Sequence, residues 1–323
     1  MRSVTVEMLW EATDPRRALR ERFGFDGGGA AVAWVTETLD RHWGIRVDAV
    51  EWIVLSHHNA LAWIDSDSGR LLAKWSVAEE RFARLAGLAE LIIRLGERGL
   101  PVSAPVPTTD GRAQVERDGA SLGLQRVVPG ALLDVADEEQ VRSAGAVLAE
   151  LHEALAADPD ATRIPGLSRP SPLGERIRGW LATRHDRTLR PAYSSLADRL
   201  ADAPPDDLPA QVVHGDYRAA NVLCSGSGVV AVLDFEEARL DHRVDELARS
   251  AVLLGTRFHD WGPVSADVRA GFLAGYQSVR RLSDPEHAWW RILVLWYSLA
   301  MIPVGEDPTG WRTVALDLAT ERR

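Results

Sequence analysis

The stretch HGDYRAAN occupies residues 214–221, and Asp234 follows thirteen residues later within VLDFEE (232–237). Together these segments supply three oxygen-bearing side chains, those of Asp216, Asn221 and Asp234. In metal-assisted phosphoryl transfer, one carboxylate orients and deprotonates the attacking hydroxyl, while an amide and a second carboxylate hold magnesium on a nucleotide triphosphate. The order and type of these groups therefore predict a magnesium-dependent phosphoryl-transfer site.

A hairpin is predicted to bring the three side chains together. The apolar runs 222–224 and 229–235 flank the flexible tip SGSG at 225–228, which is typical of two paired strands. An extended strand rises about 3.3 Å per residue, so the return through the turn can carry Asp234 back beside Asn221. The alternative is that these polar groups only cap a turn and a strand end.

HGDYRAAN with the downstream LDFEEARLDHRVDELA (233–248) resembles the aminoglycoside phosphotransferase and choline/homoserine kinase-like family, whose members are relatives of the protein kinases. The match to the family's H-G-D-x-x-x-x-N pattern has no gap and no substitution at a polar position. The resemblance implies an α+β, protein-kinase-like fold of two lobes. We expect a nucleotide-binding N-lobe with an antiparallel sheet and an N-terminal helical extension at residues 1–128. A mainly helical C-lobe at 129–323 would carry the catalytic hairpin, the metal site and the acceptor-binding helices.

The resemblance also implies roles for individual residues. Asp216 would be the catalytic carboxylate, and Asn221 and Asp234 would hold Mg²⁺. His214 and Asp245 would support the catalytic loop, since related kinases anchor the loop backbone with an aspartate just before a Leu-Ala helix start. For Asp245, a simple helix N-cap is the alternative.

Lysine occurs once in this chain, at Lys74, although 37 residues are basic. It lies in the strand-like segment 70–75, which is predicted to pair with 59–64 through the turn 65–69. In the family that the chain resembles, a lysine of the third N-lobe strand contacts the α- and β-phosphates of the nucleotide. A compact ammonium suits that task better than a planar guanidinium. The alternative is an exposed lysine with no role.

The segment SHHNA (56–60) stands where a kinase places its glycine-rich phosphate loop, but it contains no glycine. Backbone N–H groups from Ser56 to Asn59 are still expected to face phosphate, by a more restricted approach. Metal binding by the adjacent histidines is disfavoured because neighbouring side chains on a strand point to opposite faces. The glycine triplet at 27–29 is interpreted as a hinge.

A helix is predicted from about residue 78 to 98, where apolar residues recur at three- and four-residue spacing. The fold implied by the resemblance needs a glutamate on this helix to pair with Lys74, and we choose Glu90. Glu79 and Glu80 compete with it in the first turn, where acids also suit the helix dipole.

The segment LQRVVPG (124–130) resembles the connector whose backbone meets the adenine edge, so Gln125 and Val127 are predicted to contact the nucleotide. Backbone recognition imposes no side-chain requirement. ATP is therefore the expected nucleotide and GTP is not excluded.

Helices are expected to begin near 137, 173, 265 and 285, with His152 as a structural residue that makes a local hydrogen bond. Glu237 and Asp241 are candidates to face a substrate amine, with solvent as the equal alternative. The acceptor is expected to be a small molecule with a hydroxyl group, either an antibiotic or a metabolite such as homoserine, choline or a sugar. The glycine-free loop leaves a nucleotide-binding pseudokinase as a further alternative.

Composition limits the remaining classes. The chain of 323 residues with 46% hydrophobic content is long enough for two buried cores. A net charge of −10 argues against nucleic-acid binding, and the single cysteine fits a reducing compartment. The longest apolar run, 292–304, is too short to span a bilayer, and no signal-peptide pattern opens the chain. We therefore expect a cytoplasmic protein without membrane or nucleic-acid partners; its oligomeric state is not predicted.

Overall fold

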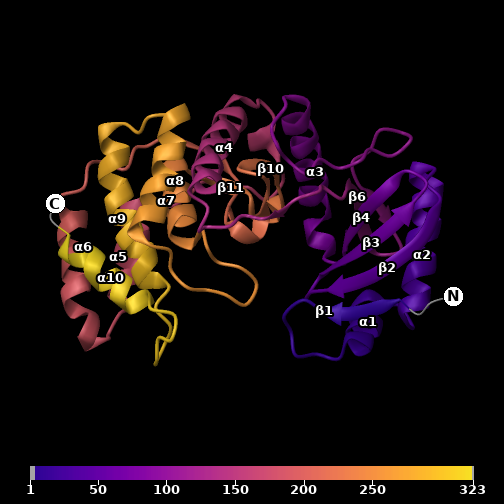
Figure 1. Cartoon of the computed structure of the whole chain (residues 1–323), viewed down its shortest axis with the longest axis horizontal. Coiled ribbons are helices and arrows are strands. Elements are labelled where there is room, and N and C mark those ends of the chain that lie inside the picture. Colours follow the sequence, from indigo (N-terminus) through magenta and orange to yellow (C-terminus); the bar gives the residue numbers. More distant parts are fainter. Residues whose placement is uncertain (1–3, 322–323) are drawn as a thin grey trace. The chain divides into compact units, whose positions relative to one another are not determined.

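The computed structural model describes residues 4–321 and divides into two compact units (Figure 1). The first unit runs to Pro129 and also includes Ile164–Gly166. The second unit begins at Gly130 and holds the rest of the chain. The sequence placed the boundary between residues 128 and 129.

The first unit is built on a six-stranded sheet in the order β1-β2-β3-β4-β6-β5. The strands are β1 (Thr5–Met8), β2 (Val47–Leu55), β3 (Asn59–Ser66), β4 (Gly69–Ser76), β5 (Val115–Arg117) and β6 (Ala120–Arg126). The helices are α1 (Pro15–Phe23), α2 (Gly28–Trp43) and α3 (Phe82–Glu97), with a 3₁₀ turn at Glu79–Arg81 before α3. All pairs are antiparallel except β1 with β2, which is parallel. The parallel pair lies at one edge of a sheet that is otherwise antiparallel, as expected.

The core of this unit joins α1 and α2 to the sheet around an aromatic cluster. The ring of Trp75 on β4 lies 5.8 Å from that of Trp34 and 6.4 Å from that of Phe23. Trp75 and Leu39 are fully buried. Burying such side chains is worth about 1.5–3 kcal/mol each, which fixes β4, the strand that carries Lys74, against the helices.

Two local predictions in this unit need correction. Gly28 and Gly29 open α2 with Gly27 as its N-cap, so the glycine triplet starts a helix and is no hinge. A Cβ on Gly28 would overlap the side chain of Val4, which explains the need for glycine there. The turn between β3 and β4 is shorter than predicted, because Ser66 already pairs with Gly69.

The second unit is mainly helical. Its helices are α4 (Glu138–Ala157), α5 (Leu173–Ala182), α6 (Arg190–Ala201), α7 (Arg243–Leu253), α8 (Ala266–Val279), α9 (Asp284–Ala300) and α10 (Trp311–Thr320). Its strands are β7 (Ala131–Leu132), β8 (Ala210–Val213), β9 (Val222–Ser225), β10 (Gly228–Val232) and β11 (Arg239–His242). Short 3₁₀ turns occur at Ala161–Arg163, Arg187–Leu189, Ala219–Asn221 and Phe235–Glu237.

Two small sheets of this unit position the catalytic segment. The predicted hairpin is present as β9 and β10, with β7 added beside β9. The strand before HGDYRAAN, β8, pairs antiparallel with β11, which the sequence did not predict as a strand. The pairing brings Val213 opposite Arg239, so the segments on either side of Asp234 are held next to the catalytic loop.

Close helix packing supports this arrangement. Helices α4 and α8 meet at Gly145 and Gly275, where a Cβ on either residue would overlap a backbone carbonyl of the other helix. Trp289 and Trp311 are buried in the core formed by α5, α6, α7, α9 and α10. Among residues 4–321, no helix combines the length and the apolar character needed to cross a membrane.

Candidate active site

The predicted catalytic loop, residues 214–221, lies in the second unit and is held together by polar contacts. Asn221 Nδ2 donates hydrogen bonds to the Asp216 backbone oxygen, at 2.8 Å, and to its Oδ2, at 2.9 Å. The Asn221 side chain is buried, whereas a fifth of the Asp216 side chain is exposed. The structure therefore brings together two of the three predicted side chains and leaves the Asp216 carboxylate accessible.

The third predicted side chain, Asp234, is tied to this loop through the strand that precedes it. Leu233 N–H donates to the Asn221 carbonyl and His214 Nε2 donates to the Leu233 carbonyl, both at 2.8 Å. Asp216 N–H in turn donates to His214 Nδ1 at 3.2 Å. His214 thus bridges the loop to the residue before Asp234, as expected for a loop-supporting residue.

Asp234 has an unusual backbone. Its φ of 56° and ψ of 76° lie in the left-handed region, which few residues other than glycine adopt. Such a conformation costs of the order of 1–3 kcal/mol and persists where the surroundings fix it. The side chain is exposed, and Asp234 lies two residues after the end of β10.

The oxygen groups of this loop fit a divalent cation. Asn221 uses its amide nitrogen toward Asp216, which leaves the carbonyl Oδ1 as the donor that magnesium prefers. Asp234 adds an exposed carboxylate. The assignment of Asn221 and Asp234 as metal ligands stays a prediction, and the donor chemistry present agrees with it.

The loop backbone is anchored by Glu246 rather than by the predicted Asp245. Glu246 accepts hydrogen bonds from the N–H of His214, at 2.9 Å, and of Gly215. His152 Nε2 donates to the same carboxylate at 2.8 Å, and its Nδ1 lies 2.9 Å from the Tyr276 hydroxyl. His152 is structural as predicted, but its contacts are long-range and not local.

Electrostatics agree with this anchoring role. Glu246 is 1% exposed, and burial by itself raises the pKa of a carboxyl group. The hydrogen bond and charge of His152, with the Gly215 N–H, outweigh burial and lower the pKa of Glu246 to about 2. Glu246 was missed because it lies next to Asp245 in the first turn of α7. Both carboxylates are buried, and the sequence does not reveal which of the two faces the catalytic loop.

Asp245 and Asp241 belong to a buried ion cluster. Arg176 contacts Asp241 at 3.1 Å and Asp245 at 3.2 Å, and Tyr297 donates to Asp245 at 3.0 Å. Burial and the charge of Asp241 raise the pKa of Asp245 to about 7, while Arg176 and Arg239 oppose that rise.

This cluster corrects the expectation that Asp241 faces a substrate or solvent, since its side chain is 2% exposed and already paired. It reaches the catalytic loop through Arg239, which contacts Asp241 at 3.2 Å and donates to the Gly215 carbonyl at 3.1 Å. Asp245 therefore supports the loop indirectly. Glu237 is exposed, so its substrate role stays a prediction.

Two arginines that the sequence did not single out contact Asp216. Arg218 Nε lies 3.0 and 3.1 Å from the two carboxylate oxygens, and Arg249 lies 3.4 Å from Oδ1. Arg249 also donates to the Gly215 carbonyl at 2.6 Å. Arg218 is two residues from Asp216 and was visible within the motif, whereas Arg249 on α7 becomes a neighbour only through the fold.

The two residues of the first unit that are predicted to act together on the phosphates, Lys74 and Glu90, differ in their exposure. Lys74 lies on β4, opposite Gly123 and Leu61, and is half-buried. Glu90 is exposed, on the side of α3 away from its buried residues. The pairing of Lys74 with Glu90 stays a prediction, and this exposure weighs against it.

Several polar groups that were expected to face the nucleotide already form hydrogen bonds within the protein. Ser56 N–H and Oγ both donate to the Asn59 carbonyl, at 2.8 and 3.2 Å, which closes a tight turn. Val127 N–H donates to the Arg70 carbonyl at 3.1 Å, and Gln125 Nε2 donates to Ser103 at 3.0 Å. The expectation that the Ser56 N–H faces phosphate is therefore corrected, because this group is committed within its turn, whereas the contact of Val127 with the nucleotide stays a prediction.

Comparisons with known proteins agree with this architecture. The model of the phosphotransferase enzyme family matches residues 56–292. A homoserine kinase from Methylobacillus flagellatus is 30% identical over 241 residues, which is 72% of this chain and 71% of that protein.

Solved structures share the fold at low sequence identity. A spectinomycin phosphotransferase in complex with ADP and spectinomycin has a TM-score of 0.57 at 14% identity, covering 89% of this chain and 93% of the other. An amicoumacin kinase in complex with AMP-PNP, Ca²⁺ and its antibiotic has a TM-score of 0.56 at 14% identity, covering 89% and 91%. These likenesses confirm the predicted α+β, protein-kinase-like fold. From the family match and the homoserine kinase relative, we conclude that the chain belongs to the phosphotransferase enzyme family and is a phosphotransferase with an alcohol group as acceptor.

Proposed function

We propose that this chain is an ATP-dependent kinase that transfers the γ-phosphoryl group to the hydroxyl of a small amino alcohol of the homoserine type. The catalytic part rests on one observation: an accessible Asp216 carboxylate is locked 2.9 Å from the Asn221 amide and joined through Leu233 to Asp234. The acceptor class is supported by the homoserine kinase relative at 30% identity. The antibiotic kinases support only the shared fold, at 14% identity.

In the proposed mechanism, Asp216 orients the acceptor hydroxyl and takes its proton as the oxygen attacks. Arg218 and Arg249 hold the carboxylate in place from two sides. Asn221 Oδ1 and the Asp234 carboxylate would hold magnesium, and Lys74 would contact the phosphates. When bound, magnesium neutralises charge on the β- and γ-phosphate oxygens.

Replacement of the proposed base tests the catalytic assignment. We expect Asp216→Ala to abolish phosphoryl transfer while AMP-PNP binding, measured by calorimetry, stays within a few-fold of wild type. The reason is that Asp216 acts on the acceptor, whereas other groups hold the nucleotide. Turnover that survives the substitution would refute the assignment.

The acceptor class is tested separately by measuring ATP consumption against homoserine, choline, sugars and aminoglycosides. We expect turnover with homoserine or a close amino alcohol. Turnover with an aminoglycoside alone would favour antibiotic inactivation instead. AMP-PNP binding without ATP consumption for any acceptor in the panel would favour the pseudokinase alternative.

A further inference from the structure

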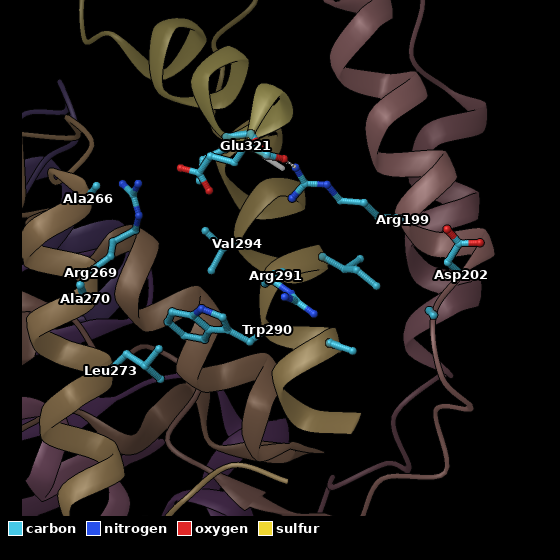
Figure 2. Close-up of a pocket in the computed structure, with 14 residues that line it drawn as sticks. Arg199, Asp202, Ala266, Arg269, Ala270, Leu273, Trp290, Arg291, Val294 and Glu321 are labelled. Carbon is cyan, nitrogen blue, oxygen red and sulfur yellow. Dashed lines mark hydrogen bonds between the residues drawn. The ribbon is translucent and has the colours of Figure 1, made fainter. Parts of the chain in front are cut away.

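The second unit contains a cavity of about 370 Å³ among α6, α8, α9 and α10 (Figure 2). None of the residues of the catalytic loop lines it. Figure 1 shows α6, α9 and α10 at one end of this unit and β10 and β11 toward the other. The volume falls within the range of about 300–1,000 Å³ that is usual for small-molecule sites.

One part of the cavity wall is apolar. Trp290 and Val294 from α9 lie in the middle of the cavity in Figure 2, with Leu273 of α8 below them. Leu318 of α10 also lines the cavity. Trp290 and Leu273 keep part of their surface exposed, whereas Val294 and Leu318 are buried. This wall suits an aromatic or aliphatic body, since covering exposed apolar surface is favourable by about 25 cal/mol per Å².

A buried guanidinium borders the apolar wall. Arg269 of α8 is only 9% exposed, and its Nη1 donates to the Val264 carbonyl at 2.8 Å. Residues 4–321 provide it with this one hydrogen bond and no ion pair, although the charge of Glu321 acts on it from a greater distance. Burial lowers the pKa of Arg269, which reflects the cost of removing its charge from water. A guanidinium has five N–H donors, so most of its capacity is unused within the protein.

The other charged groups of the wall leave one positive charge in excess. Three arginines face two carboxylates there, namely Arg199, Arg269 and Arg291 against Asp202 and Glu321. Arg199 is engaged in capping α10, since its Nη2 donates to the carbonyls of Leu318 and Glu321 at 2.7 and 3.1 Å. Arg291 is exposed and therefore well hydrated. Of the three arginines, Arg269 is the most buried, and Glu321 offsets its charge only from a distance, so a negative charge bound beside Arg269 would be neutralised there.

We propose that this cavity is a second ligand site, which binds a small monocarboxylate with an aromatic or aliphatic body. The carboxylate accepts hydrogen bonds from the planar fork of Arg269, which matches carboxylate geometry. The body lies against Trp290, Val294 and Leu318. The site is separate from phosphoryl transfer, so its occupant is neither the nucleotide nor the acceptor.

The experiment uses 4-phenylbutyrate as the probe and the uncharged 4-phenylbutanamide as its matched control, with binding measured by calorimetry on the full chain. We expect the carboxylate to bind at least tenfold more tightly than the amide. Arg269→Gln should weaken the carboxylate about 10- to 100-fold, the usual effect of losing a hydrogen bond to a charged group, and should leave the amide unchanged. Arg281→Gln, which removes an exposed arginine outside the cavity, should have no effect.

Two further variants keep the test decisive if Arg269→Gln does not fold. Ala270→Trp fills the cavity from its exposed rim and should abolish binding of both probes. Asp216→Asn should bind the carboxylate like wild type, so failure of the proposed kinase function would not affect this result. Equal binding of the two probes to wild type, or unchanged binding to Ala270→Trp, would overturn the proposal.

Discussion

Glu246 anchors the backbone of the candidate catalytic loop from outside the motif. Its carboxylate accepts hydrogen bonds from the backbone N–H groups of His214 and Gly215 and from His152 Nε2. A buried carboxylate that accepts several hydrogen bonds is stabilised in its charged form, which is why its pKa falls to about 2.

The lowered pKa of Glu246 predicts how stability depends on pH. Because the pKa is about 2 in the folded chain and 4.5 as a reference, the ionised form stabilises the fold above pH 4.5. That contribution of about 3 kcal/mol is lost as the pH falls from 4.5 toward 2. We expect Glu246→Gln to lower the free energy of unfolding by at least this amount at pH 7, measured by urea denaturation. The difference from wild type should shrink by pH 3.

The exposed Glu150 on α4 provides the control for this prediction. Glu150→Gln should leave the urea midpoint within about 0.5 kcal/mol of wild type at both pH values. A difference between Glu246→Gln and wild type that is the same at pH 7 and pH 3 would contradict the assignment, because loss of packing alone does not depend on protonation.

At the scale of elements, the contact between α4 and α8 requires two glycines. A Cβ at Gly145 would overlap the Phe272 carbonyl oxygen, and a Cβ at Gly275 would overlap that of Arg142. Since the obstacle is backbone in both cases, the helices must separate to admit a methyl group. Helix α4 also contributes the Ala144 carbonyl, which accepts a hydrogen bond from the Tyr217 hydroxyl of the catalytic loop at 2.8 Å.

We therefore expect Gly145→Ala or Gly275→Ala to destabilise the fold by about 1–3 kcal/mol and to lower turnover as well. Gly271, on the same helix α8, is the matched control, because a Cβ there would meet only the Val141 side chain at 3.5 Å. Gly271→Ala should be neutral or stabilising by up to about 1 kcal/mol, owing to the better helix propensity of alanine. Thermal unfolding measures all three, and equal effects at Gly145 and Gly271 would contradict the packing argument.

Elements with a strong local pattern could be predicted from the sequence. The paired strands β3 and β4, the β9–β10 hairpin and the long helix α4 carry their apolar periodicity and turn residues within themselves. The strands β1 and β11 could not be predicted, because each is defined by a partner distant in sequence.

The same distinction, between features set by local sequence and features set by distant partners, applies to the residues of the candidate site. Asp216, Asn221 and Asp234 were predicted as site residues from their spacing along the chain. Glu246 and Arg249 lie on α7 and reach the loop only through tertiary packing. Asp241 was misjudged because its partner, Arg176, comes from a helix 65 residues earlier.

At the scale of the whole molecule, nucleotide binding should be visible as a gain in the stability of the folded chain. A ligand that binds only the folded chain raises its free energy of unfolding by about 2.7 kcal/mol at a concentration one hundred times its Kd. Magnesium AMP-PNP should therefore raise the melting temperature of wild type.

We expect Lys74→Met and Asp234→Ala each to reduce this stabilisation strongly, because each removes a proposed contact to the phosphates or their metal. Arg46→Met, which removes an exposed cation from the first unit, should retain the full shift. Differential scanning fluorimetry with and without nucleotide measures the effect. Undiminished shifts in both site variants would show that the nucleotide is held by other residues.

The solitary lysine on β4 has a practical consequence for labelling chemistry. Amine-selective acylating reagents find only two kinds of target in this chain, the Lys74 ε-amine and the α-amine at the chain start. The two amines differ in acidity by more than two pH units in ordinary peptides, so pH separates their reactivity. The α-amine loses its proton at lower pH and reacts first, so the second added mass that appears as the pH is raised reports on the Lys74 side chain, without the background that surface lysines create in most proteins.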